Sequence, residues 1–240
     1  DAEMTAALRF ADALSRSEEA RQQNWQAFDT SLRRMLATQP SVNSINVTDL
    51  TTGRYVVHTM LPPGAVGVPA GPNALEQGRI VAEANQASIF GIRPTGPTVP
   101  DAFVPVRSPI SDGEKIVAVL TVALDSHKFS AIYDKVEYNQ NWTSALVDPT
   151  YRIAARNRAL DRFVGREITK PAYEALTQGT SGIFRSVNQE GDQVYSVFSR
   201  SPETGWSIII GVPAAEVDDP LHHLIMAVGS LGLIGAGAGV

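Results

Sequence analysis

The chain has 240 residues, of which 43% are hydrophobic and 19% are charged, so it can bury a core and is not disordered by composition. Its formal net charge of −5 argues against nucleic-acid binding, because neutralising phosphate groups requires a basic surface. Cysteine is absent, which excludes disulfides, thiolate metal sites and cysteine nucleophiles.

Residues 1–39 contain neither glycine nor proline, and their composition favours one long helix that ends at Pro40. At 1.5 Å per residue such a helix would span roughly 50 Å. It could lie along its own domain, or it could form a stalk that pairs with its copy in a homodimer. Both alternatives rest on two sets of residues spaced seven apart, which is the a/d pattern of a coiled coil. The first set is Met4, Ala11, Glu18, Trp25 and Leu32. The second set is Ala7, Leu14, Arg21, Phe28 and Met35.

A first α/β module is predicted to begin with a β-hairpin over residues 45–59, whose turn contains Gly53. A loop rich in proline and glycine covers residues 61–72. Asn73 and Glu76 then resemble a capping box for a helix over residues 74–87.

A short strand over residues 88–92 and a second proline- and glycine-rich loop over 93–100 lead to a hairpin over 103–124. Thr121 is the only polar residue of its second strand, so both faces of that strand are expected to be covered. Asp125 and Ser126 are predicted to cap a further helix that connects to a second module.

The second module repeats the order of hairpins in the first. Residues 144–156 resemble 45–58, and residues 194–212 resemble 103–124, with Arg107-Ser108-Pro109 recurring as Arg200-Ser201-Pro202. A spacing of about 100 positions indicates a domain duplication rather than a solenoid. The first copy contains loops that the second lacks, so we expect it to hold a pocket and the second copy to act as a support.

The C-terminal segment from residue 221 to 240 contains no Asp, Glu, Lys or Arg and is near the length of a membrane span. Its glycines, with Gly235 and Gly239 on one face, favour a membrane helix over an apolar helix docked on the core, because glycine is costly in soluble helices. No signal peptide precedes Asp1, so the sequence is expected to be a piece between two membrane helices that retains part of the second.

The sequence predicts no catalytic constellation, no metal site and no cofactor. None of the four histidines stands with carboxylates at a metal-ligand spacing, and neither a phosphate-binding loop nor a nucleophile elbow is found. A hydrolase would therefore lack the residues for turnover.

Taken in order, these stretches resemble the double Cache sensor domains, in which two PAS-like modules stand in tandem outside the membrane of bacterial receptors, above all of sensor histidine kinases. The resemblance covers nearly the whole chain and is carried by residues 46–53, 116–125, 146–156, 163–166, 199–206 and 211–213. It implies an α+β fold with a long N-terminal helix and two mostly antiparallel sheets flanked by helices, followed by the start of a transmembrane helix. The implied boundaries are 1–42 for the helix, 43–138 for the membrane-distal module, 139–219 for the proximal module and 220–240 for the membrane segment.

The resemblance further implies a periplasmic domain at the bacterial inner membrane that binds a small molecule in its distal module and signals through helices. Its amino-acid-binding branch uses an Arg-x-Trp-Tyr cluster that this sequence lacks, which argues against an amino-acid ligand. The output module would be a histidine kinase. Alternatives are a chemotaxis receptor, a diguanylate cyclase, or a membrane-tethered binding or adaptor protein with no output module.

From the residues themselves, we expect a ligand site beside the central hairpin of the distal module. Phe90 and Phe103 could form aromatic walls, Ser88 could donate a hydrogen bond, and Arg93 and Arg107 could clamp an organic anion. Phe103 and Arg107 alternate onto one face of their strand. Arg107 could instead be a structural or surface residue, since Arg200 occupies what the sequence suggests is the same place in the second module. Arg93 has no such counterpart and is the stronger candidate.

Overall fold

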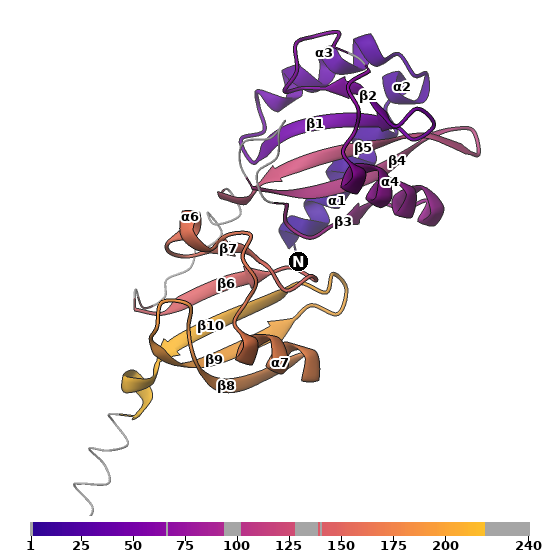
Figure 1. Ribbon diagram of the computed structural model, residues 1–240. Helices are drawn as coiled ribbons and strands as arrows, with labels where there is room; N and C mark the ends of the chain where they lie inside the picture. The colour runs from indigo at the N-terminus through magenta and orange to yellow at the C-terminus, as the bar shows by residue number, and fades with distance from the viewer. Residues whose placement is uncertain (1, 66, 94–101, 128–138, 140, 219–240) are drawn as a thin grey trace, which may run out of the picture.

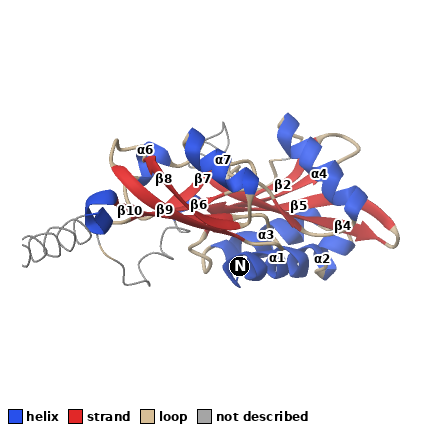
Figure 2. Ribbon diagram, turned by 90° about the horizontal axis from the view of Figure 1, so that it is seen from below, coloured by secondary structure: helices blue, strands red, loops and turns tan. Residues whose placement is uncertain are grey.

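The computed structural model describes residues 2–65, 67–93, 102–127, 139 and 141–218, which form two antiparallel sheets with helices on both faces (Figures 1 and 2). The first sheet has the order β2-β1-β5-β4-β3 and the second has the order β7-β6-β10-β9-β8. The strands of the first are β1 (Val42–Asp49), β2 (Arg54–His58), β3 (Ser88–Ile89), β4 (Phe103–Asp112) and β5 (Lys115–Asp125). Those of the second are β6 (Thr143–Val147), β7 (Ile153–Arg156), β8 (Ser181–Val187), β9 (Gln193–Arg200) and β10 (Ser207–Pro213). The helices are α1 (Ala2–Ser15), α2 (Glu18–Arg21), α3 (Trp25–Leu36), α4 (Pro72–Ala84), α6 (Leu160–Phe163) and α7 (Lys170–Gln178).

The two sheets confirm the α+β fold of tandem PAS-like modules. All four predicted hairpins form, as β1–β2, β4–β5, β6–β7 and β9–β10, and the sheets share one topology. Figure 2 shows α1, α2 and α3 on one face and α4, α6 and α7 on the other. The large apolar core lies between the first sheet and the N-terminal helices, where alternate residues of the central strands, such as Val106 and Leu120, are completely buried.

The N-terminal segment is helical, as predicted, but it is not one continuous helix. Ser17 and Asn24 accept hydrogen bonds from the N–H groups of Ala20 and Ala27, so each begins a new helix, and Gln23 between them has a left-handed φ of 55°. Residues of the heptad pattern, including Phe28 and Leu32, are buried against the chain's own first sheet. The segment thus lies along its own domain, and homodimerisation through it stays a prediction.

Two local predictions in the first module differ from the structure. The predicted capping box is wrong, because α4 begins at Pro72 with Gly71 as its N-cap, and Asn73 lies inside the helix. Proline fits the first helical turn, where its missing N–H has no intrahelical acceptor to bond. The strand predicted over residues 88–92 is limited to Ser88–Ile89. The helix predicted after Ser126 and the membrane helix predicted over 220–240 fall outside the described residues.

No helix within the described ranges is long and apolar enough to cross a bilayer.

The two modules meet through a buried carboxylate. Asp148, which follows β6 and is 2% exposed, accepts hydrogen bonds through Oδ1 from the N–H groups of Thr150 and Arg152 in its own turn. Its Oδ2 accepts a 2.7 Å hydrogen bond from the N–H of Ile92 in the first module. Ala154, Ala155 and Trp206 of the second module belong to the same buried apolar cluster as the first sheet. Asp148 thus connects the segment after β3 to the second sheet.

We predict that Asp148→Ala lowers the free energy of unfolding by about 2–4 kcal/mol, because one buried and two partly buried N–H groups lose a charged acceptor. Asp49→Ala is the matched control. Asp49 is the last residue of β1, the corresponding strand of the first sheet, but its side chain bonds only the exposed N–H groups of Thr51 and Thr52, so its loss should cost about 1 kcal/mol. Urea denaturation followed by circular dichroism measures both, and equal losses would contradict the coupling role of Asp148.

Candidate functional site

A row of polar side chains crosses the first sheet on the face that α4 covers. Strand register places His58 opposite Asn46, Asn46 opposite Thr121, Thr121 opposite Arg107 and Arg107 opposite Ser88. Residues directly opposite each other in antiparallel strands project from the same face, so all five side chains lie on one side of the sheet. Every strand of this sheet therefore contributes one polar residue to the row.

Arg107 is the arginine of this row, between Thr121 and Ser88, and is buried, with 4% of its surface exposed. Its Nη1 donates to Thr121 Oγ1 at 2.5 Å and its Nε donates to Gln77 Oε1 of α4 at 3.2 Å. Its guanidinium lies 6.0 Å from the centre of the Phe90 ring. Burial lowers the pKa of Arg107 to about 10; Tyr55 acts to raise it and Arg93 to lower it further. Arg107 is neither a surface residue nor part of a salt bridge among the described residues.

The structure brings the five predicted site residues together on this face. Arg93 and Phe103 exchange backbone hydrogen bonds of 2.8 and 3.0 Å, and Phe90 donates its N–H to Pro105 O at 3.0 Å. Phe103 and Arg107 are four residues apart on β4, so they share a face as predicted. Most of the loop predicted after Arg93 lies outside the described residues. Whether these side chains bind a ligand stays a prediction.

Tyr55 and His58 of β2 belong to the same site but were missed by sequence reasoning. Their rings meet edge to face, with centroids 4.8 Å apart. An irregularity in the pairing of β1 with β2 places both on the α4 face although they are three residues apart. Burial raises the pKa of the Tyr55 hydroxyl, while Arg107 and a hydrogen bond with the backbone of Gly71 act to lower it, so the hydroxyl is a proton donor at neutral pH. Thr121, the lone polar residue of an apolar strand, was the signal in the sequence that could have identified this face.

The charges of the site are not balanced within the described part of the chain. No Asp or Glu oxygen lies within 4.0 Å of Arg93 or Arg107 there. Arg93 Nε, Thr48 Oγ1 and His58 Nε2 are buried and have no hydrogen-bond partner among the described residues. Two neighbouring cations, of which Arg93 has a buried donor without a described acceptor, form a site whose chemical complement is an anion.

The second sheet has no equivalent of this cation. Asp49 ends β1 and Asp148 directly follows β6, the corresponding strand of the second sheet. Three residues before Asp49 stands Asn46, which is opposite Thr121, and three residues before Asp148 stands Ala145, which is opposite Ile209. Ile209 in turn pairs with Phe198, which therefore occupies the position of Arg107. The correspondence of Arg107 with Arg200 is thus wrong by two residues, and the argument that Arg107 is structural because Arg200 matches it does not apply.

Comparison with known proteins identifies the fold. No protein-family profile and no curated protein matches the sequence. Among solved structures, the extracellular domain of mmHK1S-Z3, provisionally described as a histidine kinase, is 13% identical with a TM-score of 0.69, covering 93% of this chain and 92% of that one. The sensor domain of the Vibrio cholerae histidine kinase DctB is 12% identical with a TM-score of 0.62, covering 88% and 90%. The sensory domain of the Campylobacter jejuni chemoreceptor Tlp3, solved with isoleucine bound, is 12% identical with a TM-score of 0.62, covering 90% and 86%. This chain thus has the tandem PAS-like fold of these sensor domains.

We predict that Arg107→Met raises the free energy of unfolding by about 1 kcal/mol in the absence of ligand, because it removes a buried cation that no described carboxylate balances. Arg156→Met is the matched control. Arg156 is also buried but pairs with Glu190 at 2.9 Å, so its loss should lower the free energy of unfolding by about 2 kcal/mol. Urea denaturation measures both, and equal destabilisation by the two substitutions would show that Arg107 is a structural cation.

A second prediction concerns pH. The pKa of His58 lies below its ordinary value of 6.5 because burial and the nearby Arg33 disfavour the charged imidazole. The unfolded chain therefore takes up this proton at a higher pH than the folded chain. This contribution to the free energy of unfolding should decrease as pH falls below about 6.5 and become constant below the folded pKa. His58→Gln should remove it, so wild-type and variant stabilities should converge or cross between about pH 8 and 5. Parallel pH profiles would contradict the prediction.

Proposed function

We propose that this chain is the ligand-sensing input domain of a bacterial membrane receptor and that its first module binds a small organic anion. The observation that carries the proposal is the burial of Arg107 beside Arg93 without a described counter-ion. A buried charge is costly unless it is paired, so such a site is stabilised when an anion enters. The fold, which is that of the sensor domains of histidine kinases and chemoreceptors, supports the same function.

The charges favour a carboxylate ligand over a zwitterion. Arg93 and Arg107 supply two cations, Tyr55 supplies a neutral hydroxyl donor, and no described carboxylate lies within salt-bridge distance of the two guanidinium groups to accept an ammonium group. An amino acid would place its positive charge beside two others. A dicarboxylate offers one carboxylate to each guanidinium, so we take it as the best match.

The site is connected to the elements that would transmit a signal. Ser108, next to Arg107 on β4, points to the opposite face and shares a 2.9 Å hydrogen bond with Ser15 at the end of α1. Ile92, next to Arg93, donates its N–H to Asp148 of the second module. A ligand that alters the positions of the two arginines thus acts directly on an N-terminal helix and on the module interface. If the domain has two conformations, the ligand can shift the equilibrium between them only by as much as its affinities for the two conformations differ.

On this proposal the domain lies in the periplasm, residues 220–240 begin a membrane helix, and the chain binds its ligand without converting it. The output module would be a histidine kinase, as in several of the similar structures. A chemotaxis receptor is the second candidate, because chemoreceptor sensory domains match the fold to a similar degree. Homodimerisation would require the outward face of the N-terminal helices, since their apolar residues are buried on the first sheet.

Isothermal titration of the 240-residue chain tests the proposal, with succinate, propionate and L-valine as probes. We expect succinate to bind most tightly and L-valine least. Arg107→Met and Arg93→Gln should each weaken succinate binding by at least roughly 30-fold, because a charge-assisted pair contributes about 2 kcal/mol or more. Arg107→Met should therefore lose binding although it gains stability, which separates loss of the ligand from loss of the fold.

Arg200→Gln is the control for these variants. It belongs to the second copy of the Arg-Ser-Pro motif, and its guanidinium lies 5.4 Å from the centre of the Tyr151 ring in the second module. It should bind succinate as the wild type does. Equal weakening by Arg200→Gln, or undiminished binding by Arg107→Met, would overturn the assignment of the site.

A further inference from the structure

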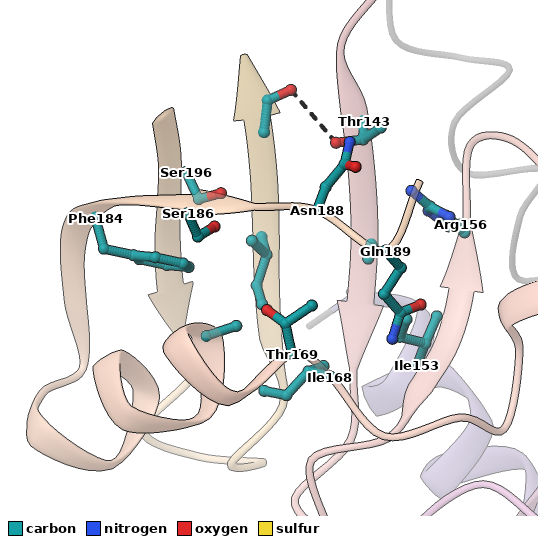
Figure 3. Close-up of a pocket in the computed structure, with 14 residues that line it drawn as sticks. Thr143, Ile153, Arg156, Ile168, Thr169, Phe184, Ser186, Asn188, Gln189 and Ser196 are labelled. Carbon is teal, nitrogen blue, oxygen red and sulfur yellow. Dashed lines mark hydrogen bonds between the residues drawn. The ribbon is translucent and has the colours of Figure 1, made fainter. Parts of the chain in front are cut away.

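The second module, expected from the sequence to be a support only, contains a cavity of about 70 Å³ between its sheet and α7. At 10–15 Å³ per water-sized position, it has room for roughly five non-hydrogen atoms. Figure 3 shows Arg156 and Gln189 on one side of this cavity, with Phe184, Ser186 and Ser196 on the other. None of the lining residues is acidic.

Arg156 presents an unused donor to this cavity. It lies on the edge strand β7, directly opposite the small side chain of Ala145, and its side chain is 5% exposed. Its Nη2 donates to Glu190 at 2.9 Å and its guanidinium lies 4.3 Å from the centre of the Phe163 ring. Its Nη1 is buried and has no hydrogen-bond partner in the part of the chain that the structure describes. The guanidinium is therefore held in place by one nitrogen while the other is free to donate.

Gln189 presents an unused acceptor to the same cavity. Its Nε2 donates to the carbonyl of Glu167 at 2.7 Å, which fixes the amide. Its Oε1 is buried and has no partner within the described ranges. A donor and an acceptor without described partners, both lining one cavity with apolar walls such as Ile153 and Ile209, are the features of a built polar site rather than of a packing defect.

We propose that this cavity is a second ligand site, specific for a small hydroxy acid. The carboxylate accepts a hydrogen bond from Arg156 Nη1, the hydroxyl donates to Gln189 Oε1, and the short carbon skeleton lies against the apolar walls. Arg156 and Arg158 share Glu190 at 2.9 and 3.1 Å, and Asp192 lies 4.0 Å from Arg158, so the charges here are close to balance. This site therefore suits a compact monoanion, whereas the two unbalanced arginines of the first module suit a dianion. The inference does not depend on the proposed function of the first module.

Glycolate, which has five non-hydrogen atoms, is the probe. Isothermal titration is done on the Arg107→Met variant of the 240-residue chain, in which the first site is disabled. We expect glycolate to bind this variant, and acetate and glycolamide to bind at least roughly tenfold more weakly, because each lacks one of the two matching groups.

Substitutions within the cavity locate the binding. Ala145→Leu, added to Arg107→Met, should fill the space and abolish the glycolate signal, whereas Ala145→Ser leaves the space open and should retain it. Gln189→Leu removes the acceptor at a partly exposed position and should weaken glycolate, but not acetate, by roughly tenfold. Thermal melts check that each variant folds. Absence of glycolate binding to Arg107→Met, or unchanged binding after both Ala145→Leu and Gln189→Leu, would overturn the proposal.

Discussion

A guanidinium buried without a described counter-ion is the constraint on which the first module of this molecule depends. Arg107 lies on a strand paired on both sides, by β3 and β5, so its backbone position is fixed, and Gln77 of α4 closes over it. A polar row crosses that face between a few buried apolar side chains such as Val81 and Val119, so most of the apolar stabilisation of the sheet lies elsewhere. It comes from the opposite face, where α1 and α3 bury Phe28, Val106 and Leu120, and from the apolar contact with the second module.

The two sheets share one topology and differ in the chemistry of one row across them. In the first sheet that row is His58, Asn46, Thr121, Arg107 and Ser88, and in the second it is Arg156, Ala145, Ile209, Phe198 and Gly182. The buried cation therefore lies on an inner strand in one module and on an edge strand in the other. An inner-strand cation has little room for a carboxylate partner from a neighbouring loop, whereas the edge-strand cation is reached by Glu190. This difference in position explains why one arginine is paired and the other is not.

The sequence predicted the hairpins and the buried residues better than it predicted the breaks in the N-terminal helix and the equivalent positions of the two modules. Alternation and glycine turns are local signals, so all four hairpins were found. The heptad pattern marked buried residues such as Phe28 correctly, but a spacing of seven does not require an unbroken helix, and the side chains of Ser17 and Asn24 start new ones. The Arg-Ser-Pro match suggested a wrong equivalence because corresponding positions are defined by strand register. Tyr55 and His58 were missed for a similar reason, since only an irregularity in the pairing brings both to the α4 face.

Coupling between the site and the rest of the chain follows from the alternation of side chains along β4. Arg107 faces α4, and Val106 and Ser108 on either side of it face α1, so no displacement of the Arg107 backbone can leave the α1 face unchanged. The segment after β3 is coupled in a similar way. Arg93 pairs with Phe103 of β4, and its neighbour Ile92 donates its N–H to Asp148 of the second module. Closely packed faces do not deform continuously, so a small shift of either arginine is expected to favour one of a few discrete packings of α1 and of the module interface. A charge placed on a paired strand is, for this reason, a better origin for a signal than one placed on a loop.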